Sequence, residues 1–172
     1  MKEENRKTAI DRMLKKIPGL TYCVIIGLSV SAIINIFVCQ TVRVSGYSME
    51  PSYHDGDRLI MEKLSYRVGD PERFDVVVFP RNGNYYLVKR IIGLPGETVH
   101  INPSGEIFID GILLEEGYGM EPIDNAGIAE KSILLRSDEY FVLGDNRNNS
   151  ADSRNAEIGN VCIGEISGKI MW

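Results

Sequence analysis

The chain has 172 residues, 44% of them hydrophobic and 25% charged, a composition that argues against wholesale disorder. Its net charge of −5 argues against nucleic acid as a partner, because phosphate binding requires basic patches. The charge is uneven: residues 1–16 carry six cationic and three acidic side chains, and the remainder carries 13 cationic and 21 acidic ones. A cationic tail therefore precedes an acidic body.

An uncharged stretch follows this tail. Residues 20–38 form 19 consecutive positions without a charge, and about 20 residues of helix cross the hydrocarbon core of a bilayer. The stretch lacks the amphipathic period of a buried core helix and is long for the apolar region of a cleavable signal sequence. We expect a cytoplasmic tail over residues 1–18, a transmembrane helix over residues 19–39 and an extracytoplasmic domain over residues 40–172, because the cationic flank stays inside.

Beyond this stretch the pattern is that of short strands separated by turns. β-Branched and aromatic residues occur in short runs, with Gly, Asn and Asp between them. Pro80 is expected to end one strand, and residues 115–131 are expected to form a surface loop. The expected fold class is mainly β, an antiparallel coiled-sheet or barrel-like domain. The strands are expected at residues 41–44, 58–61, 74–79, 85–92, 98–102, 106–109, 112–114 and 140–143.

The cysteines indicate neither a disulfide nor a metal centre. Cys23 and Cys39 lie in or at the end of the uncharged stretch, which leaves Cys162 as the one cysteine of the following domain. The sequence contains no CxxC motif and no His/Cys cluster with ligand spacing. We therefore expect no metal and no cofactor.

A serine and a lysine are the strongest candidates for catalysis. Ser48 stands in the run Ser-Met-Glu-Pro just beyond the uncharged stretch, and Lys89 follows the apolar Leu87 and Val88. A serine nucleophile needs a base, and burial lowers the pKa of a lysine from about 10.4 toward the range of about 7–8 that suits a base. Arg90 cannot serve, because a guanidinium stays protonated. The pair indicates a serine hydrolase next to a membrane.

A histidine base is the alternative. His54 falls in a turn, and His100 ends a predicted strand. A triad of Ser48, His100 and Asp152 is conceivable from the spacing alone, because triads are defined by geometry and not by chain order.

Four blocks in fixed order resemble the type I signal peptidase (leader peptidase) family of Ser-Lys serine proteases, in its compact single-anchor form similar to Gram-positive members. The resemblance covers almost the whole chain after the uncharged stretch. The blocks are SGYSMEP at residues 45–51, DRLI at 57–60, the stretch from RFDVVVF to KRIIGLPGE at 73–97, and GDNRNNSADSR at 144–154.

The resemblance implies roles for single residues. Ser48 would be the nucleophile, Lys89 its general base, and Ser150 a hydroxyl that orients the lysine amine. The Ser48 backbone N–H would donate to the oxyanion, while the second donor is in doubt, because Gly46 stands where Gram-negative members have a serine. Four charged residues would brace the polar loop, and three apolar ones would shape the substrate pocket. These sets are Asp145, Arg147, Asp152 and Arg154, and Val44, Leu87 and Val88.

The function that follows from the resemblance is removal of signal peptides from secreted preproteins, cleaving after small residues in the A-x-A pattern. The expected partners are these preproteins, the lipid bilayer and the secretion translocon. Two alternatives stay open at this point. The chain could be a related Ser-Lys self-cleaving protease, or a catalytically inactive, membrane-tethered factor for preprotein binding or assembly.

Overall fold

The computed structural model describes residues 19–32, 37–81, 85–119 and 121–171. The chain divides into two compact units, residues 1–38 and 39–172, and each is described by itself. The first contains a helix over residues 19–32. Within the described residues, no helix has both the length and the hydropathy required to cross a bilayer. The predicted span at 19–39 includes residues 33–36, and the predicted tail is residues 1–18; both segments lie outside the described residues.

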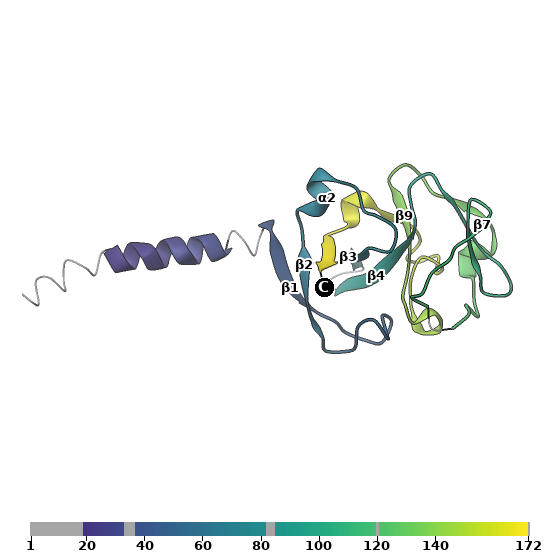
Figure 1. The fold of residues 1–172 in the computed structure, drawn as a ribbon, viewed down its shortest axis with the longest axis horizontal. Helices are drawn as coiled ribbons and strands as arrows, with labels where there is room; N and C mark the ends of the chain where they lie inside the picture. Colours follow the sequence, from purple (N-terminus) through teal and green to yellow (C-terminus); the bar gives the residue numbers. More distant parts are fainter. Residues whose placement is uncertain (1–18, 33–36, 82–84, 120, 172) are drawn as a thin grey trace, which may run out of the picture. The chain divides into compact units, whose positions relative to one another are not determined.

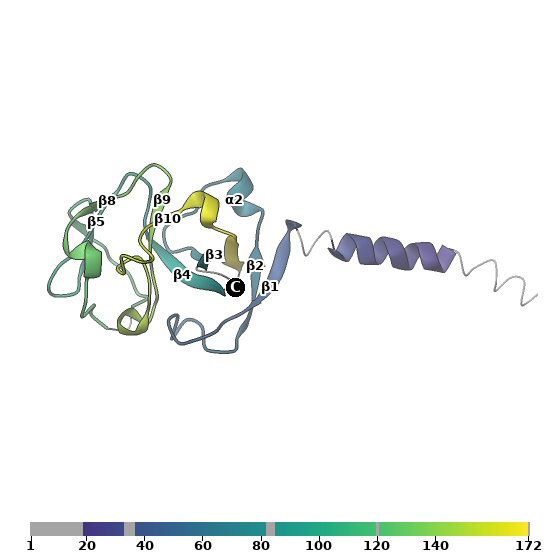
Figure 2. The same cartoon turned by 180° about the vertical axis from the view of Figure 1, so that it is seen from behind.

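The second unit is built on two antiparallel sheets, so the predicted mainly β, antiparallel class is confirmed (Figures 1 and 2). The larger sheet has seven strands, and β1 lies at one of its ends. Its strands in spatial order are β1 (Cys39–Arg43), β2 (Arg58–Glu62), β11 (Gly168–Met171), β3 (Val76–Arg81), β4 (Tyr85–Gly93), β9 (Glu139–Leu143) and β10 (Val161–Cys162).

The smaller sheet has four strands, in the order β7 (Ile112–Leu113), β6 (Ile107–Ile109), β5 (Thr98–Ile101) and β8 (Ile133–Leu134). Asp110 and Gly111 both have positive φ, as a tight turn between β6 and β7 requires. Short helical turns complete the unit: α2 (Ser65–Val68), η1 (Gly127–Glu130), η2 (Arg147–Asn149) and η3 (Ile163–Glu165).

Three hydrophobic clusters hold the sheets together. One contains buried residues of the small sheet and of β9, among them Phe141. The other two lie on opposite faces of β3, because successive side chains of a strand alternate: Val76 and Val78 belong to one, Val77 and Phe79 to the other. Strand β4 changes character along its length. Tyr85 is exposed, while the residues from Lys89 to Gly93 are buried.

Pro80 does not end its strand, contrary to prediction. Strand β3 continues through Pro80 to Arg81, and Pro80 pairs with Tyr86 of β4. On its other side β3 pairs with β11 only at Val77 and Val78. Pro80 therefore lies where the described strands border β3 on one side only, a position at which the missing N–H of a proline is tolerated.

Candidate active site

Ser48 and Lys89 come together as predicted. Ser48 lies in the turn that follows β1, and Lys89 lies in β4 at the point where the strand becomes buried. Lys89 Nζ is 2.7 Å from Ser48 Oγ, and it donates a 2.9 Å hydrogen bond to the carbonyl oxygen of Val88. The two residues are 41 positions apart in sequence, so the long-range pairing of the strands creates this contact.

The surroundings of Lys89 favour its neutral form. The side chain is 2% exposed. Burial lowers the pKa of Lys89 to about 8, against the opposing charges of Asp152 and Asp145. A neutral amine at this distance can accept the hydroxyl proton of Ser48, which is the task of a general base.

Asn146 fixes the turn that carries Ser48. Its backbone N–H donates to the Ser48 carbonyl oxygen at 3.1 Å, and its Nδ2 donates to the Tyr47 carbonyl oxygen at 3.1 Å. On the other side, the Gly46 N–H donates to Asp55 Oδ1 at 2.8 Å. Met49 is buried in the cluster of β1, β2 and β3. The nucleophile is thus held by backbone contacts on both sides.

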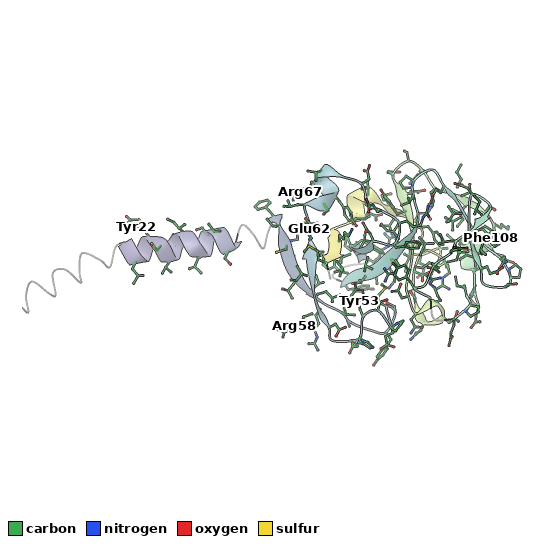
Figure 3. The ribbon with its side chains drawn as sticks, in the orientation of Figure 1. Tyr22, Tyr53, Arg58, Glu62, Arg67 and Phe108 are labelled. Carbon is green, nitrogen blue, oxygen red and sulfur yellow. The ribbon has the colours of Figure 1, made fainter. Side chains whose placement is uncertain are left out.

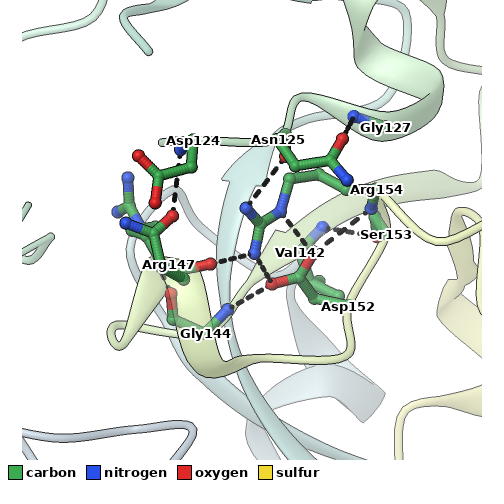
Figure 4. A network of polar contacts seen from close by, with 10 residues as sticks. Asp124, Asn125, Gly127, Val142, Gly144, Arg147, Asp152, Ser153 and Arg154 are labelled. Atoms are coloured by element: carbon green, nitrogen blue, oxygen red, sulfur yellow. Dashed lines mark hydrogen bonds and ion pairs between the residues drawn. The ribbon is translucent and has the colours of Figure 1, made fainter. Parts of the chain in front are cut away.

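Two buried ion pairs flank the lysine. Asp145 accepts two hydrogen bonds from Arg90, at 2.8 Å from Nε and 2.6 Å from Nη2, and both side chains are almost inaccessible. Asp152 is paired with Arg154 in the same bidentate way, at 2.8 and 2.9 Å, and also accepts the Gly144 N–H (Figure 4). Breaking such a buried pair by removing one partner typically costs about 3–5 kcal/mol. Asp145, Asp152 and Arg154 are thus held in buried ion pairs, and their bracing role stays a prediction.

Arg147 joins this network from the short helix η2. Its Nε donates to the Gly144 carbonyl oxygen at 3.1 Å, and its guanidinium pairs with Glu116. Its own carbonyl oxygen accepts a hydrogen bond from Arg154 (Figure 4). The polar loop is therefore one connected set of buried charges.

Ser150 is close to the site but makes no hydrogen bond there. Its Oγ is buried and, among the described residues, has no hydrogen-bond partner. A Cβ added at Gly144 would lie 2.2 Å from Ser150 Oγ and 2.4 Å from the Ser48 carbonyl oxygen, so only glycine fits between them. The predicted bond from Ser150 to the lysine amine is not among the described hydrogen bonds, and the orienting role stays a prediction.

A groove lies between β1 and the exposed half of β4, and Ser45, three residues before Ser48, contributes to its lining. It has a volume of about 580 Å³. Its lining residues Met61 and Val78 belong to the apolar cluster in which Val44 is buried. Val88 packs against that cluster. Leu87 packs against the cluster on the opposite face of the sheet, so the packing does not support its prediction as a pocket residue. The lining residues are Gln40, Thr41, Val42, Arg43, Ser45, Met61, Lys63, Val78, Tyr85, Tyr86 and Ser167.

The alternative triad of Ser48, His100 and Asp152 is not assembled. His100 lies in β5 of the small sheet, with its ring 6.3 Å from that of Phe108. The Asp152 carboxylate is paired with Arg154 and not with a histidine. His54 lies in an exposed turn beside Asp57. Among the described residues, no group of three or more His, Cys, Asp and Glu side chains could hold a metal ion.

Comparison with known proteins agrees with this geometry. The family model described as "Signal peptidase, peptidase S26" matches residues 17–172. The chain belongs to the signal peptidase family. The resemblance read from the sequence is thereby confirmed.

Curated signal peptidases align with most of this chain. A probable signal peptidase I-2 of Synechocystis is 41% identical over 70% of this chain and 56% of its own length. A signal peptidase I of Bacillus licheniformis is 34% identical over 90% of this chain and 83% of its own length. A solved signal peptidase I from Enterococcus faecalis is 31% identical, covering 60% of this chain and 99% of that chain, with a TM-score of 0.47. The chain thus spans about half of the Synechocystis relative and most of the Bacillus one.

Several residues around the candidate dyad were not predicted. The sequence analysis excludes Arg90 as a base and assigns it no other role. Its position next to Lys89 in the third block was the signal that could have identified it as the partner of Asp145. Asn146 lies inside the fourth block, but its contact with the Ser48 turn spans nearly a hundred residues. Glu116 pairs with Arg147, and the Tyr118 ring centroid lies 3.7 Å from Arg90 Cζ. Both residues fall in the predicted surface loop, and no pattern in the sequence distinguishes them.

Proposed function

We propose that this chain is a serine endopeptidase that removes signal peptides from preproteins, with Ser48 as nucleophile and Lys89 as general base. The observation that supports this most directly is the 2.7 Å approach of a buried lysine amine to a serine hydroxyl. The burial lowers the pKa of Lys89 to about 8, close enough to neutrality for an effective base.

The first half of the reaction acylates the serine. Neutral Lys89 accepts the Ser48 hydroxyl proton while Oγ attacks the scissile carbonyl carbon. Negative charge then develops on the carbonyl oxygen, for which the Ser48 backbone N–H is the proposed donor, since it makes no hydrogen bond within the described structure. The protonated Lys89 gives its proton to the leaving amine, and the mature protein departs.

The second half releases the signal peptide. Lys89, neutral again, takes a proton from a water molecule, which attacks the acyl carbon on Ser48 Oγ. The bond to Oγ breaks, and the proton on Lys89 returns to the serine. Asp145 and Asp152 would favour a protonated lysine, and their pairing with Arg90 and Arg154 limits this effect.

The substrate is proposed to bind as an added strand in the groove. Among the described strands, β1 is at the end of its sheet, and β4 pairs with β9 only from Arg90 onward. Two free strand edges therefore border the groove, and an extended peptide can pair with such edges. Val44 and Val88 would form the shallow apolar wall that accepts small residues before the cut and excludes larger ones.

The membrane is the proposed place of action. The uncharged stretch at residues 20–38 and the cationic segment before it fit an anchor whose N-terminus is cytoplasmic, with residues 40–172 extracytoplasmic. The partners are then signal-peptide-bearing preproteins, the bilayer and the secretion translocon.

Cleavage of a preprotein by the purified full chain in detergent tests the function. We expect a single cut after an A-x-A sequence, identified by mass spectrometry. Ser48→Ala should abolish the cut and leave the fold intact, while Ser104→Ala, in an exposed turn of the small sheet, should cut like the parent. Intact preprotein with the folded parent chain would favour an inactive binding factor. A cut in the chain itself, with the preprotein left whole, would favour a self-cleaving protease.

A further inference from the structure

A segment that the sequence predicts as the last residue of a strand and the start of a surface loop lies against the buried arginines of the site. We call residues 114–119 the strap. Leu114 at its start packs against the core of the small sheet. Glu116 pairs with Arg147, whose Nη2 donates to Glu116 Oε2 at 2.7 Å. At its end, a Cβ added to Gly119 would be 3.0 Å from Arg147 Cζ. The strap is therefore fixed at both ends.

Tyr118 of the strap covers the guanidinium of Arg90. The Cζ atom of Arg90 is 3.7 Å from the centroid of the Tyr118 ring, a close cation–π contact. In its own plane the guanidinium already donates to Asp145, to the Phe74 carbonyl oxygen and to Ser52 Oγ. The Tyr118 ring thus covers one face of the Arg90 guanidinium, while the N–H groups of the guanidinium donate within its plane to other partners.

Phe74 holds the same arginine from another side. It has a positive φ of 73°, a conformation that costs a residue other than glycine roughly 1–3 kcal/mol. Its carbonyl oxygen accepts the 2.9 Å bond from Arg90 Nη1, and its ring centroid is 5.1 Å from that of Tyr118. Strained residues persist where their surroundings fix them. Here the Phe74 carbonyl oxygen and the Tyr118 ring both contact Arg90, and the Phe74 ring packs on Tyr118.

The position of Arg90 matters for the neighbouring Lys89. The carboxylates that act on Lys89 are Asp145 and Asp152, and both favour its protonated form. The positive charge of Arg154 offsets the charge of Asp152, and that of Arg90 offsets the charge of Asp145. The phenol of Tyr53 also interacts electrostatically with Arg90 and Asp145. Water admitted to Arg90 would weaken its pairing with Asp145 and reduce the desolvation of the lysine. Both changes stabilise the ammonium form.

We propose that Tyr118 is a positioning residue of the dyad: its ring keeps Arg90 paired with Asp145 and shielded from water, which favours the neutral, proton-accepting form of Lys89. This inference rests on the proposed role of Lys89 as general base. The competing interpretation is that Tyr118 only packs on Phe74, in which case its loss would affect stability and leave the titration of Lys89 unchanged.

The test compares Tyr118→Leu with Tyr118→Phe in the full chain in micelles. The titration of Lys89 is followed by NMR of ¹³C-labelled lysine and assigned by the signal lost in Lys89→Arg, and the pH dependence of preprotein cleavage is measured in parallel. Tyr118 is half-buried, so we expect both variants to fold. Phe108→Leu is the matched control, since Phe108 lies in β6, at the opposite side of the unit from Tyr53 (Figure 3).

We expect Tyr118→Leu to move the midpoint of Lys89 upward by about half a pH unit. This shift corresponds to about a threefold lower rate below the midpoint and an unchanged rate well above it. Tyr118→Phe and Phe108→Leu should titrate like the parent chain. An unchanged Lys89 midpoint in folded Tyr118→Leu would overturn the proposal, as would an equal loss of rate at every pH. If Tyr118→Leu does not fold, Tyr118→Met is held to the same criteria.

The NMR titration needs no substrate. If the parent chain cleaves no preprotein, the proposed function fails, yet the effect of Tyr118 on Lys89 is still measured. The two failures are therefore distinguishable.

Discussion

Ser150 stands out among single residues, because its buried hydroxyl has no hydrogen-bond partner within the described structure. Leaving a buried hydroxyl unpaired costs about 1–3 kcal/mol, so a purely structural serine would be better replaced by alanine. A hydroxyl that orients the lysine amine during the reaction would instead be needed only for turnover.

We therefore expect Ser150→Ala to lower kcat by about tenfold, less than the roughly 10²–10⁴-fold contributed by a group that itself transfers the proton. KM and the melting temperature should be nearly unchanged. Steady-state kinetics and thermal unfolding of the variant measure both effects. A variant with parental kcat would show that Ser150 has no part in catalysis.

At this scale the sequence predicts the candidate dyad, and it does not predict most of the residues that surround the dyad. Ser48 and Lys89 are predicted because each stands in a block with a distinct pattern. The compensation of Asp145 by Arg90 depends on a contact across 55 positions, and a loop supplies the aromatic cover of Arg90. Propensities and local patterns carry no information on such contacts.

At the scale of elements, β4 separates two surfaces by the alternation of its side chains. Val88 packs against the cluster that contains Val44, and Leu87 packs against the cluster on the opposite face. A larger side chain at Val88 should narrow the pocket proposed for small residues, whereas one at Leu87 should not.

Val88→Phe should lower kcat/KM for an A-x-A preprotein by about tenfold, within the range for methylene-scale changes in an apolar pocket. Leu87→Phe, the matched variant one residue earlier, should have a smaller effect. The two values of kcat/KM, with circular dichroism as a check on folding, decide the matter. A larger loss of kcat/KM for Leu87→Phe than for Val88→Phe would contradict the proposal that the pocket lies on the Val88 face of β4.

The strands themselves are well predicted where alternation and turn residues are clear, as for β2 and β9. The prediction that Pro80 ends its strand was wrong. At Pro80 the described β3 pairs with a neighbouring strand on one side only, and the sequence alone does not reveal this pairing. The two-residue strand β8 was also missed. It forms by pairing with β5, and a two-residue apolar run has no periodicity of its own.

At the scale of the whole molecule, the proposed anchor separates this chain from a free protease. We expect the full chain to stay with membranes during an alkaline carbonate wash. Ile25→Arg with Leu28→Arg should release it, because each charge at the centre of a span costs about 2.5–3.5 kcal/mol. Immunoblots of the pellet and supernatant report the outcome. Release of the unmodified chain would contradict the anchor.

The pH dependence of cleavage, with Lys89→Arg beside the parent, tests the central claim most directly. Lys89 is competent only when neutral, so activity should fall as the pH drops below its pKa of about 8, by about tenfold per pH unit. Lys89→Arg should be inactive even at high pH, because a guanidinium is not deprotonated. Lys169→Arg, a half-exposed lysine paired with Asp75, should match the parent. Cleavage by Lys89→Arg at a comparable rate, or a parental rate without this limb, would contradict the role of Lys89 as the base that activates Ser48.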